Sequence, residues 1–173
     1  MRKKSKLTRD QHLQAAKAIH AIRLGIAEIA NVKLKGRVPH AVMAAVKNVE
    51  RQLSHLCDHL AYAANEGETP EIYILPMPGV VSVPFQKSAL PLTVDDHLMV
   101  GAELFRLRTQ LMELTTALDG HFRKASPVDR ALQWPERAVD HLRCKLDDLF
   151  CMQHPDEFDT RVYYPGGMPS DLA

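Results

Sequence analysis

The sequence predicts a mainly α-helical protein, an antiparallel bundle of four main helices with a short β-hairpin between the second and third helices and an extended C-terminal tail. Three observations support this prediction. Long stretches repeat apolar residues at steps of three and four, which is the period of a helix. Serine or threonine stands where several of these stretches begin, as helix caps do. One intervening stretch, 71–85, is rich in β-branched residues and proline instead.

Length and composition indicate one globular domain over residues 1–173. The chain is long enough to bury a core, and its 46% hydrophobic and 25% charged residues are ordinary values. No run approaches the roughly 18 apolar residues of a membrane span, and no apolar segment follows the basic start as in a signal peptide. Three cysteines fit a reducing compartment better than a disulfide framework. We therefore expect a cytoplasmic protein that makes no membrane contact.

Two helices are predicted in the first 65 residues. Thr8 and Gln11 have the spacing of a capping box, and the apolar stripe that follows ends near Val32. Gly36 suits the left-handed conformation after a helix, and Pro39 suits the first turn of the next one. The second stripe has the alternating four- and three-residue steps that are typical of antiparallel bundle packing: Val42, Val46, Val49, Leu53, Leu56 and Leu60.

The composition changes between residues 67 and 92. Two β-rich runs, 71–75 and 80–85, are separated by Pro76-Met77-Pro78-Gly79, which predicts a turn between two short strands. A two-stranded hairpin on its own is marginally stable in water. We therefore expect it to lie on the bundle, to pair with another subunit, or to become ordered on a partner.

The third helix is predicted from Thr93 to about Lys124, with Thr93 as its cap. It has a main apolar stripe and a second apolar flank, so we expect it to pack against two or more other helices. That flank consists of Leu98, Phe105 and Met112.

Another helical segment starts at Ser126-Pro127, where a cap residue precedes a proline at the first helical position. Trp134-Pro135 predicts a break or kink in it. A last helix is then expected from about Pro135 to Met152, followed by a tail over residues 154–173.

Charge is distributed unevenly along the chain. Residues 1–37 contain ten basic residues against two acidic ones, although the net charge of the whole chain is only +1. Such a basic region, with residues 1–7 as an arm, either neutralises acidic parts of the same or a neighbouring subunit or contacts nucleic acid. No aromatic residues interleave the cations, so a base-stacking platform is not indicated. The candidate nucleic-acid residues are Arg2, Lys3, Lys4, Lys6, Arg9, Lys33, Lys35 and Arg37.

Histidines and cysteines suggest a metal site as a further alternative. His55 and His59 stand four residues apart on the second predicted helix and share a face, and His141 and Cys144 stand three apart on the last one. Imidazole and thiolate ligands suit zinc. The other interpretation is that the two histidines of the second helix are exposed and that the last helix packs against the tail, the hairpin or a second copy.

Known catalytic motifs are absent from the sequence: it contains no GxSxG, P-loop, GxGxxG, HExxH or CxxC. We predict no catalytic residue and no cofactor. The sequence favours a non-enzymatic binding or regulatory protein that acts through protein–protein contacts and self-association. The alternatives are a nucleic-acid-associated accessory protein and a helical-bundle metalloprotein. The candidate association surface comprises Ile72, Ile74, Val81, Val83, Phe85, Cys144 and Cys151.

Overall fold

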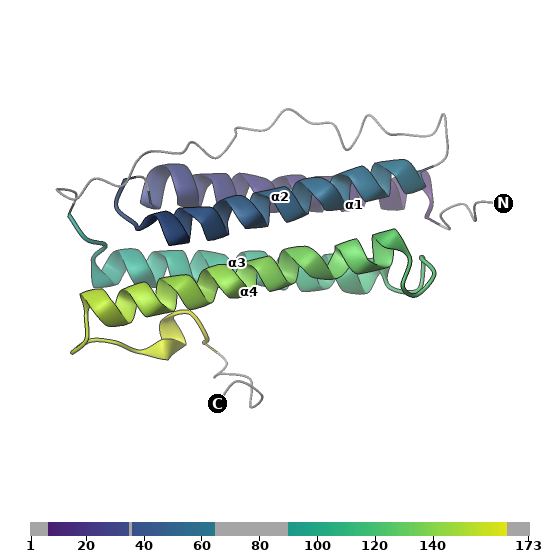
Figure 1. Ribbon diagram of the computed structural model, residues 1–173. Helices are drawn as coiled ribbons and strands as arrows, with labels where there is room; N and C mark the ends of the chain where they lie inside the picture. The colour runs from purple at the N-terminus through teal and green to yellow at the C-terminus, as the bar shows by residue number, and fades with distance from the viewer. Residues whose placement is uncertain (1–6, 35, 65–89, 166–173) are drawn as a thin grey trace.

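The computed structural model describes residues 7–34, 36–64 and 90–165, which contain four long helices in two layers (Figure 1). One layer holds α1 (Arg9–Glu28) and α2 (His40–Ala63), and the other holds α3 (Val94–Leu118) and α4 (Pro127–Gln153). A π-helical turn, η1 (Ile29–Lys33), extends α1. The predicted helical bundle is confirmed.

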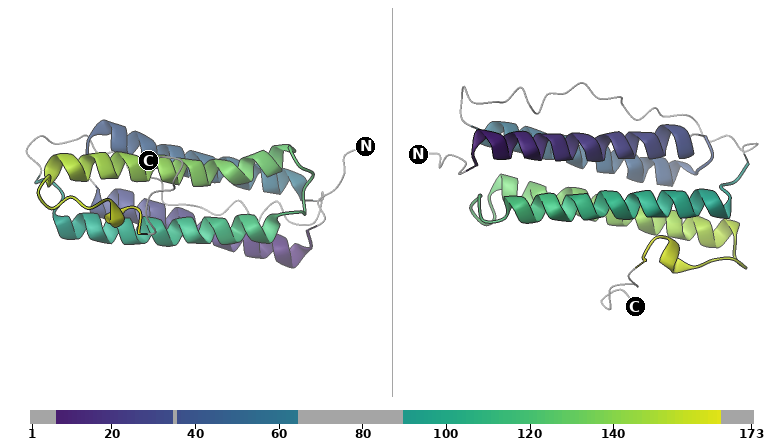
Figure 2. Two further views of the ribbon diagram at one scale, coloured as in Figure 1. Left: turned by 90° about the horizontal axis from the view of Figure 1, so that it is seen from below. Right: turned by 180° about the vertical axis from the view of Figure 1, so that it is seen from behind.

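The connections make every neighbouring pair of helices antiparallel (Figures 1 and 2). Short turns join α1 to α2 and α3 to α4, whereas α2 and α3 run in the same direction. Residues 64–93 therefore connect opposite ends of the bundle. This order gives a four-helix bundle with one long crossover connection. Its two layers meet where α2 packs against α4 and α1 packs against α3.

The caps predicted at Thr8 and Thr93 are confirmed in detail, whereas Pro39 stands just before α2, at its N-cap position, and not in its first turn. The Thr8 hydroxyl accepts the Gln11 N–H, while the Gln11 side chain accepts the Thr8 N–H at 2.8 Å. Thr93 and Asp96 form the same reciprocal cap on α3. Gly36 has the expected positive φ of 69°. The two reciprocal caps satisfy backbone N–H groups that a helix start leaves without partners.

The sequence predicts a break or a kink at Trp134-Pro135, and the break is wrong, because α4 is one continuous helix from Pro127 to Gln153. A proline inside a helix costs about 3 kcal/mol, since it removes one N–H and crowds the preceding turn. Here Pro135 is itself buried, and the turns on either side of it bury several apolar residues in the bundle. That burial outweighs the local cost. The third helix also ends earlier than predicted, at Leu118.

The β-hairpin predicted over residues 71–85 is wrong as part of the fold. Within residues 7–34, 36–64 and 90–165 the structure contains helices and turns and no strand, and residues 71–85 themselves lie outside these ranges. β-branched residues favour a strand only where a partner strand and a packing surface support it. Each described helix instead buries its apolar face against other helices, so the described core needs no sheet.

The core takes residues from all four helices and from the tail. Leu53, Leu104 and Leu142 have no exposed surface, and neither does Tyr163, which follows a 3₁₀ turn, η3 (Thr160–Val162). The described part of the tail, residues 154–165, therefore folds back onto α3 and α4 (Figure 2). Among the described residues, we find no helix with the length and apolar character that a membrane span requires.

Candidate functional site

Polar side chains gather where the tail packs on α3 and α4. We call His97, Gly101, Arg143 and Tyr163 the tail anchor, and His97 is its centre. His97 is completely buried, and its ring stacks on Phe150 with 4.6 Å between centroids. Its Nδ1 lies 2.7 Å from the Tyr163 hydroxyl and its Nε2 lies 3.1 Å from the Gln153 carbonyl oxygen. A neutral ring with the proton on Nε2 satisfies both contacts, because the amide oxygen only accepts and the hydroxyl can donate.

The charge state of His97 follows from this burial. Burial lowers the pKa of the imidazole below its ordinary value, and the hydrogen bond to Gln153 opposes that effect only in part. The nearby Asp96 carboxylate is held by Arg37, and the hydrogen bonds from Arg37 and from the Thr93 backbone lower the pKa of Asp96 to about 2. His97 is therefore a neutral link between α3 and the tail.

Arg143 of α4 completes the tail anchor. Its guanidinium is buried, donates two hydrogen bonds to the Tyr163 carbonyl, and lies 4.3 Å from the centroid of the Tyr164 ring. A third donor contacts Asp140 at 2.9 Å. The Tyr164 hydroxyl lies 3.0 Å from the Cys144 sulfur. These contacts bind the tail through its backbone and both tyrosines.

A close approach of two backbones locates the tail on α3. A Cβ atom added at Gly101 would lie 2.1 Å from the Val162 carbonyl oxygen. Only glycine leaves enough room for the tail at this position. The tail anchor is thus a structural unit in which the polar groups of α3, α4 and the tail are hydrogen-bond partners of one another.

A different kind of surface runs along the outside of α3. Leu98, Phe105 and Met112 are 48%, 46% and 45% exposed and stand seven residues apart. The positions between them on the same face, Ala102 and Thr109, are also exposed and uncharged. Steps of four and three keep these positions in one line along a helix. We call Leu98, Phe105 and Met112 the α3 stripe.

The tail lies beside the α3 stripe. Gly101, which contacts Val162 of the tail, stands three residues after Leu98 and four before Phe105. Residues at those spacings are neighbours on a helix surface. The tail segment therefore borders the stripe.

The outer side of α2 and α4 carries four cations, of which three are exposed and Lys145 is partly buried. Lys47 and Arg51 on α2, and Arg137 and Lys145 on α4, form what we call the basic face. Arg51 donates to the Asn48 side-chain oxygen at 2.6 Å, and Arg137 donates to the Gln133 side-chain oxygen at 3.3 Å. Within the described residues, neither arginine forms an ion pair.

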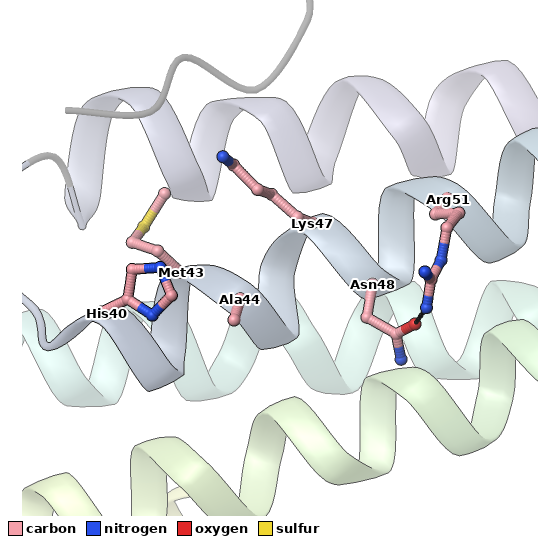
Figure 3. Close-up of a pocket in the computed structure, with 6 residues that line it drawn as sticks. All are labelled: His40, Met43, Ala44, Lys47, Asn48 and Arg51. Atoms are coloured by element: carbon pink, nitrogen blue, oxygen red, sulfur yellow. Dashed lines mark hydrogen bonds between the residues drawn. The ribbon is translucent and has the colours of Figure 1, made fainter. Parts of the chain in front are cut away.

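Two shallow pockets lie on this side. The first has a volume of about 290 Å³ and is lined by α2 alone, and Figure 3 shows the Arg51 guanidinium turned toward Asn48 at its edge. The second, of about 420 Å³, lies between α2 and α4 beside Trp134. Asn48 lines both pockets. The basic face is thus a hollowed polar surface that spans two helices.

The described nucleic-acid candidates do not form one cluster, because Arg9 begins α1 whereas Lys33 and Arg37 lie beyond the other end of that helix. Arg2, Lys3, Lys4, Lys6 and Lys35 lie outside the described residues. Arg9 is exposed at the start of α1, and Lys33 contacts the Met99 sulfur at 4.0 Å. Arg37 is engaged in the fold, because it binds Asp96 at 2.7 Å and the carbonyls of Leu90 and Pro91.

The predicted metal ligands lie on two helices. His55 is exposed, whereas His59 packs edge-on against Trp134 with 6.1 Å between centroids. His141 is exposed, and Cys144 contacts Tyr164. In the part of the chain that the structure describes, no group of three or more His, Cys, Asp or Glu side chains is arranged to hold a metal ion.

The predicted association residues have different outcomes. Ile72, Ile74, Val81, Val83 and Phe85 lie outside the described residues. Cys144 and Cys151 are exposed on α4, and the tail contacts the first of them. Their role in association stays a prediction. The tail is one of the three packing partners that the sequence predicts for this side of α4, together with the hairpin and a second copy of the chain.

Sequence reasoning missed the basic face, because its cations come from helices about 90 residues apart in the chain. It noted the second flank of α3 but expected other helices to bury it, and the structure leaves it exposed. Comparisons of the chain with protein-family models, curated proteins and solved structures found no match.

Proposed function

We propose that this chain is a non-enzymatic binding protein that associates with a second copy of itself through the α3 stripe. The observation that carries the proposal is the exposure of three large apolar side chains at seven-residue intervals on one helix face. Exposed apolar residues that line up in this way mark interaction sites more often than scattered ones do.

The pattern suits a copy of the same chain. Leu98 and Met112 are equidistant from Phe105, so a twofold axis near Phe105 would place Leu98 of one copy opposite Met112 of the other. Such an interface is self-complementary, as in most homodimers. Small uncharged residues between the three large ones would let two helices approach closely. The nearest charge, the Arg108 guanidinium, contacts the Met112 sulfur at 2.9 Å and is already paired with Glu136 and Asp140.

The expected affinity is modest. Leu98 and Met112 are 14 residues apart, or about 21 Å along a helix, so the stripe supplies an interface at the small end of the observed range. We expect a dissociation constant on the order of 10 μM.

Sedimentation velocity over a range of protein concentrations tests the proposal. The native chain should change from monomer to dimer, and Phe105→Glu should remain monomeric because it would bury an unpaired charge at the twofold axis. Leu24→Glu is the matched control, since Leu24 is a similarly exposed apolar residue (41%) on α1. It should dimerise like the native chain. A native chain that stays monomeric at about 100 μM, or a dimeric Phe105→Glu variant, would contradict the proposal.

A further inference from the structure

We propose that the basic face binds the phosphodiester backbone of nucleic acid. This proposal goes beyond self-association and does not depend on it, because the basic face lies on α2 and α4 and the α3 stripe lies on α3. It also uses different residues from the basic N-terminal region.

The first argument is that the two arginines of the basic face carry charges that no carboxylate of the described residues neutralises. Arg37, Arg106, Arg108, Arg143 and Arg161 each bind a carboxylate of the chain. Arg51 and Arg137 bind only neutral amide oxygens.

Lys47 likewise forms no ion pair within the described residues, and Lys145 has an exposed partner, Asp148, at 3.5 Å. Asp58 is exposed seven residues after Arg51, on the same side of α2, whereas the other nearby acids face other directions. Glu136 binds Arg108, and Glu50 is about 100° around the helix from Arg51.

The second argument is that these cations lie on one surface. The α2–α4 pair is the most extensive helix contact of the bundle, and the pocket between them is lined by residues near Arg51 together with Arg137 itself. Arg137 and Lys145 are about 12 Å apart along α4, which is the rise of three to four base pairs. The face is therefore a suitable size for three or four phosphate contacts.

The third argument distinguishes nucleic acid from an acidic protein. A protein interface usually has an apolar centre, with aromatic or aliphatic anchors. The exposed large hydrophobics of α2 and α4 are Tyr62 and Met152, and both lie in the last turns of their helices, outside the stretches that carry the cations. Trp134 lines the pocket between the two helices but is partly buried there. The basic face offers polar donors in the same pocket, including the amides of Asn48 and Gln52. Arginine, lysine and amide side chains are the usual donors to phosphate oxygens.

The test measures binding of the full-length chain to a fluorescently labelled DNA duplex of about 20 base pairs by anisotropy, at several salt concentrations. With three or four phosphate contacts, the logarithm of the binding constant should fall with the logarithm of salt concentration with a slope of about −3. The double variant Arg51→Gln/Arg137→Gln should bind at least about tenfold more weakly at low salt, and its slope should be shallower by about two.

The matched control is Lys17→Gln/Lys124→Gln, which removes two exposed cations of α1 and the α3–α4 turn. It changes the net charge equally and should bind within about twofold of the native chain. A second pair on the face, Lys47→Gln/Lys145→Gln, should repeat the loss. Thermal melting shows whether each variant is folded.

Several outcomes would overturn the proposal. Equal losses in the face and control variants would mean that binding follows net charge alone. Unchanged binding in both face variants would locate nucleic-acid contact elsewhere, for example at the basic N-terminal region. Polyglutamate that competes as strongly as unlabelled duplex at equal charge would assign the face to acidic proteins.

Discussion

The two sides of α4 use arginine in different ways. On the side toward α3 and the tail, Arg143 is buried and binds both a carboxylate and a backbone carbonyl. On the side toward α2, Arg137 is exposed and contacts one amide oxygen at 3.3 Å. The first arrangement satisfies a charge that has been removed from water, and the second leaves a charge available to solvent.

The difference shows what each side does for the molecule. A buried guanidinium must be compensated within the fold, since an uncompensated buried charge would destabilise the native state by several kcal/mol. An exposed guanidinium contributes little to stability, so its position is not set by folding. The tail anchor is therefore a structural device, and the cations of the basic face stay available to the partner that we propose.

Replacing an arginine on each side should give the largest contrast. Arg143→Met removes the donors to the Tyr163 carbonyl and should lower the free energy of unfolding by about 2–3 kcal/mol. Arg137→Met, on the side toward α2, should change it by less than about 0.5 kcal/mol. Urea unfolding monitored by circular dichroism measures both values. Equal changes in the two variants would remove the distinction between the sides.

The tail contact at Gly101 gives a smaller effect. Gly101→Ala brings a methyl group against the Val162 carbonyl and should cost about 1–3 kcal/mol as the tail shifts. Gly120→Ala is the control, because Gly120 has a φ of 76° and open space around it, so its cost of about 1 kcal/mol is local strain.

Hydrogen exchange separates the two glycine variants. The amides of Val162 and Tyr163 are hydrogen-bonded within the tail and should exchange faster only in Gly101→Ala. Unchanged protection there would show that the tail does not depend on this contact.

The pH dependence of stability gives the smallest effect. Burial lowers the pKa of His97 in the folded chain, so the unfolded chain binds a proton more readily. The neutral His97 ring contributes its full share of the free energy of unfolding above the ordinary histidine pKa of about 6.5. As the pH falls below that value, this contribution decreases by at most about 1.4 kcal/mol per pH unit. Unfolding at pH 7.5 and 5.5 should show a smaller loss for His97→Gln than for the native chain. Identical losses would mean that His97 is not a neutral link.

Much of the bundle could be predicted from the sequence, because helix caps and periodic apolar faces are local signals. Thr8, Thr93 and Ser126 cap the predicted helices, and Gly36 has the predicted left-handed conformation. The prediction failed at Pro135, where packing against the bundle keeps a helix continuous that local preference would break. The prediction of a β-hairpin as part of the fold also failed, because β propensity produces a strand only where a partner strand is present.

The sequence by itself determined which residues form helices and which helix faces are apolar, since both depend on neighbours within one or two turns. Only the tertiary structure decided that α2 and α4 pack side by side, which brings Arg51 and Arg137 onto one surface. It also decided that the second flank of α3 stays exposed and that His97 meets Tyr163. The physical reason is that these contacts join residues far apart in the chain, such as His97 and Tyr163 at a separation of 66 positions. Chain packing rather than local preference brings such residues together.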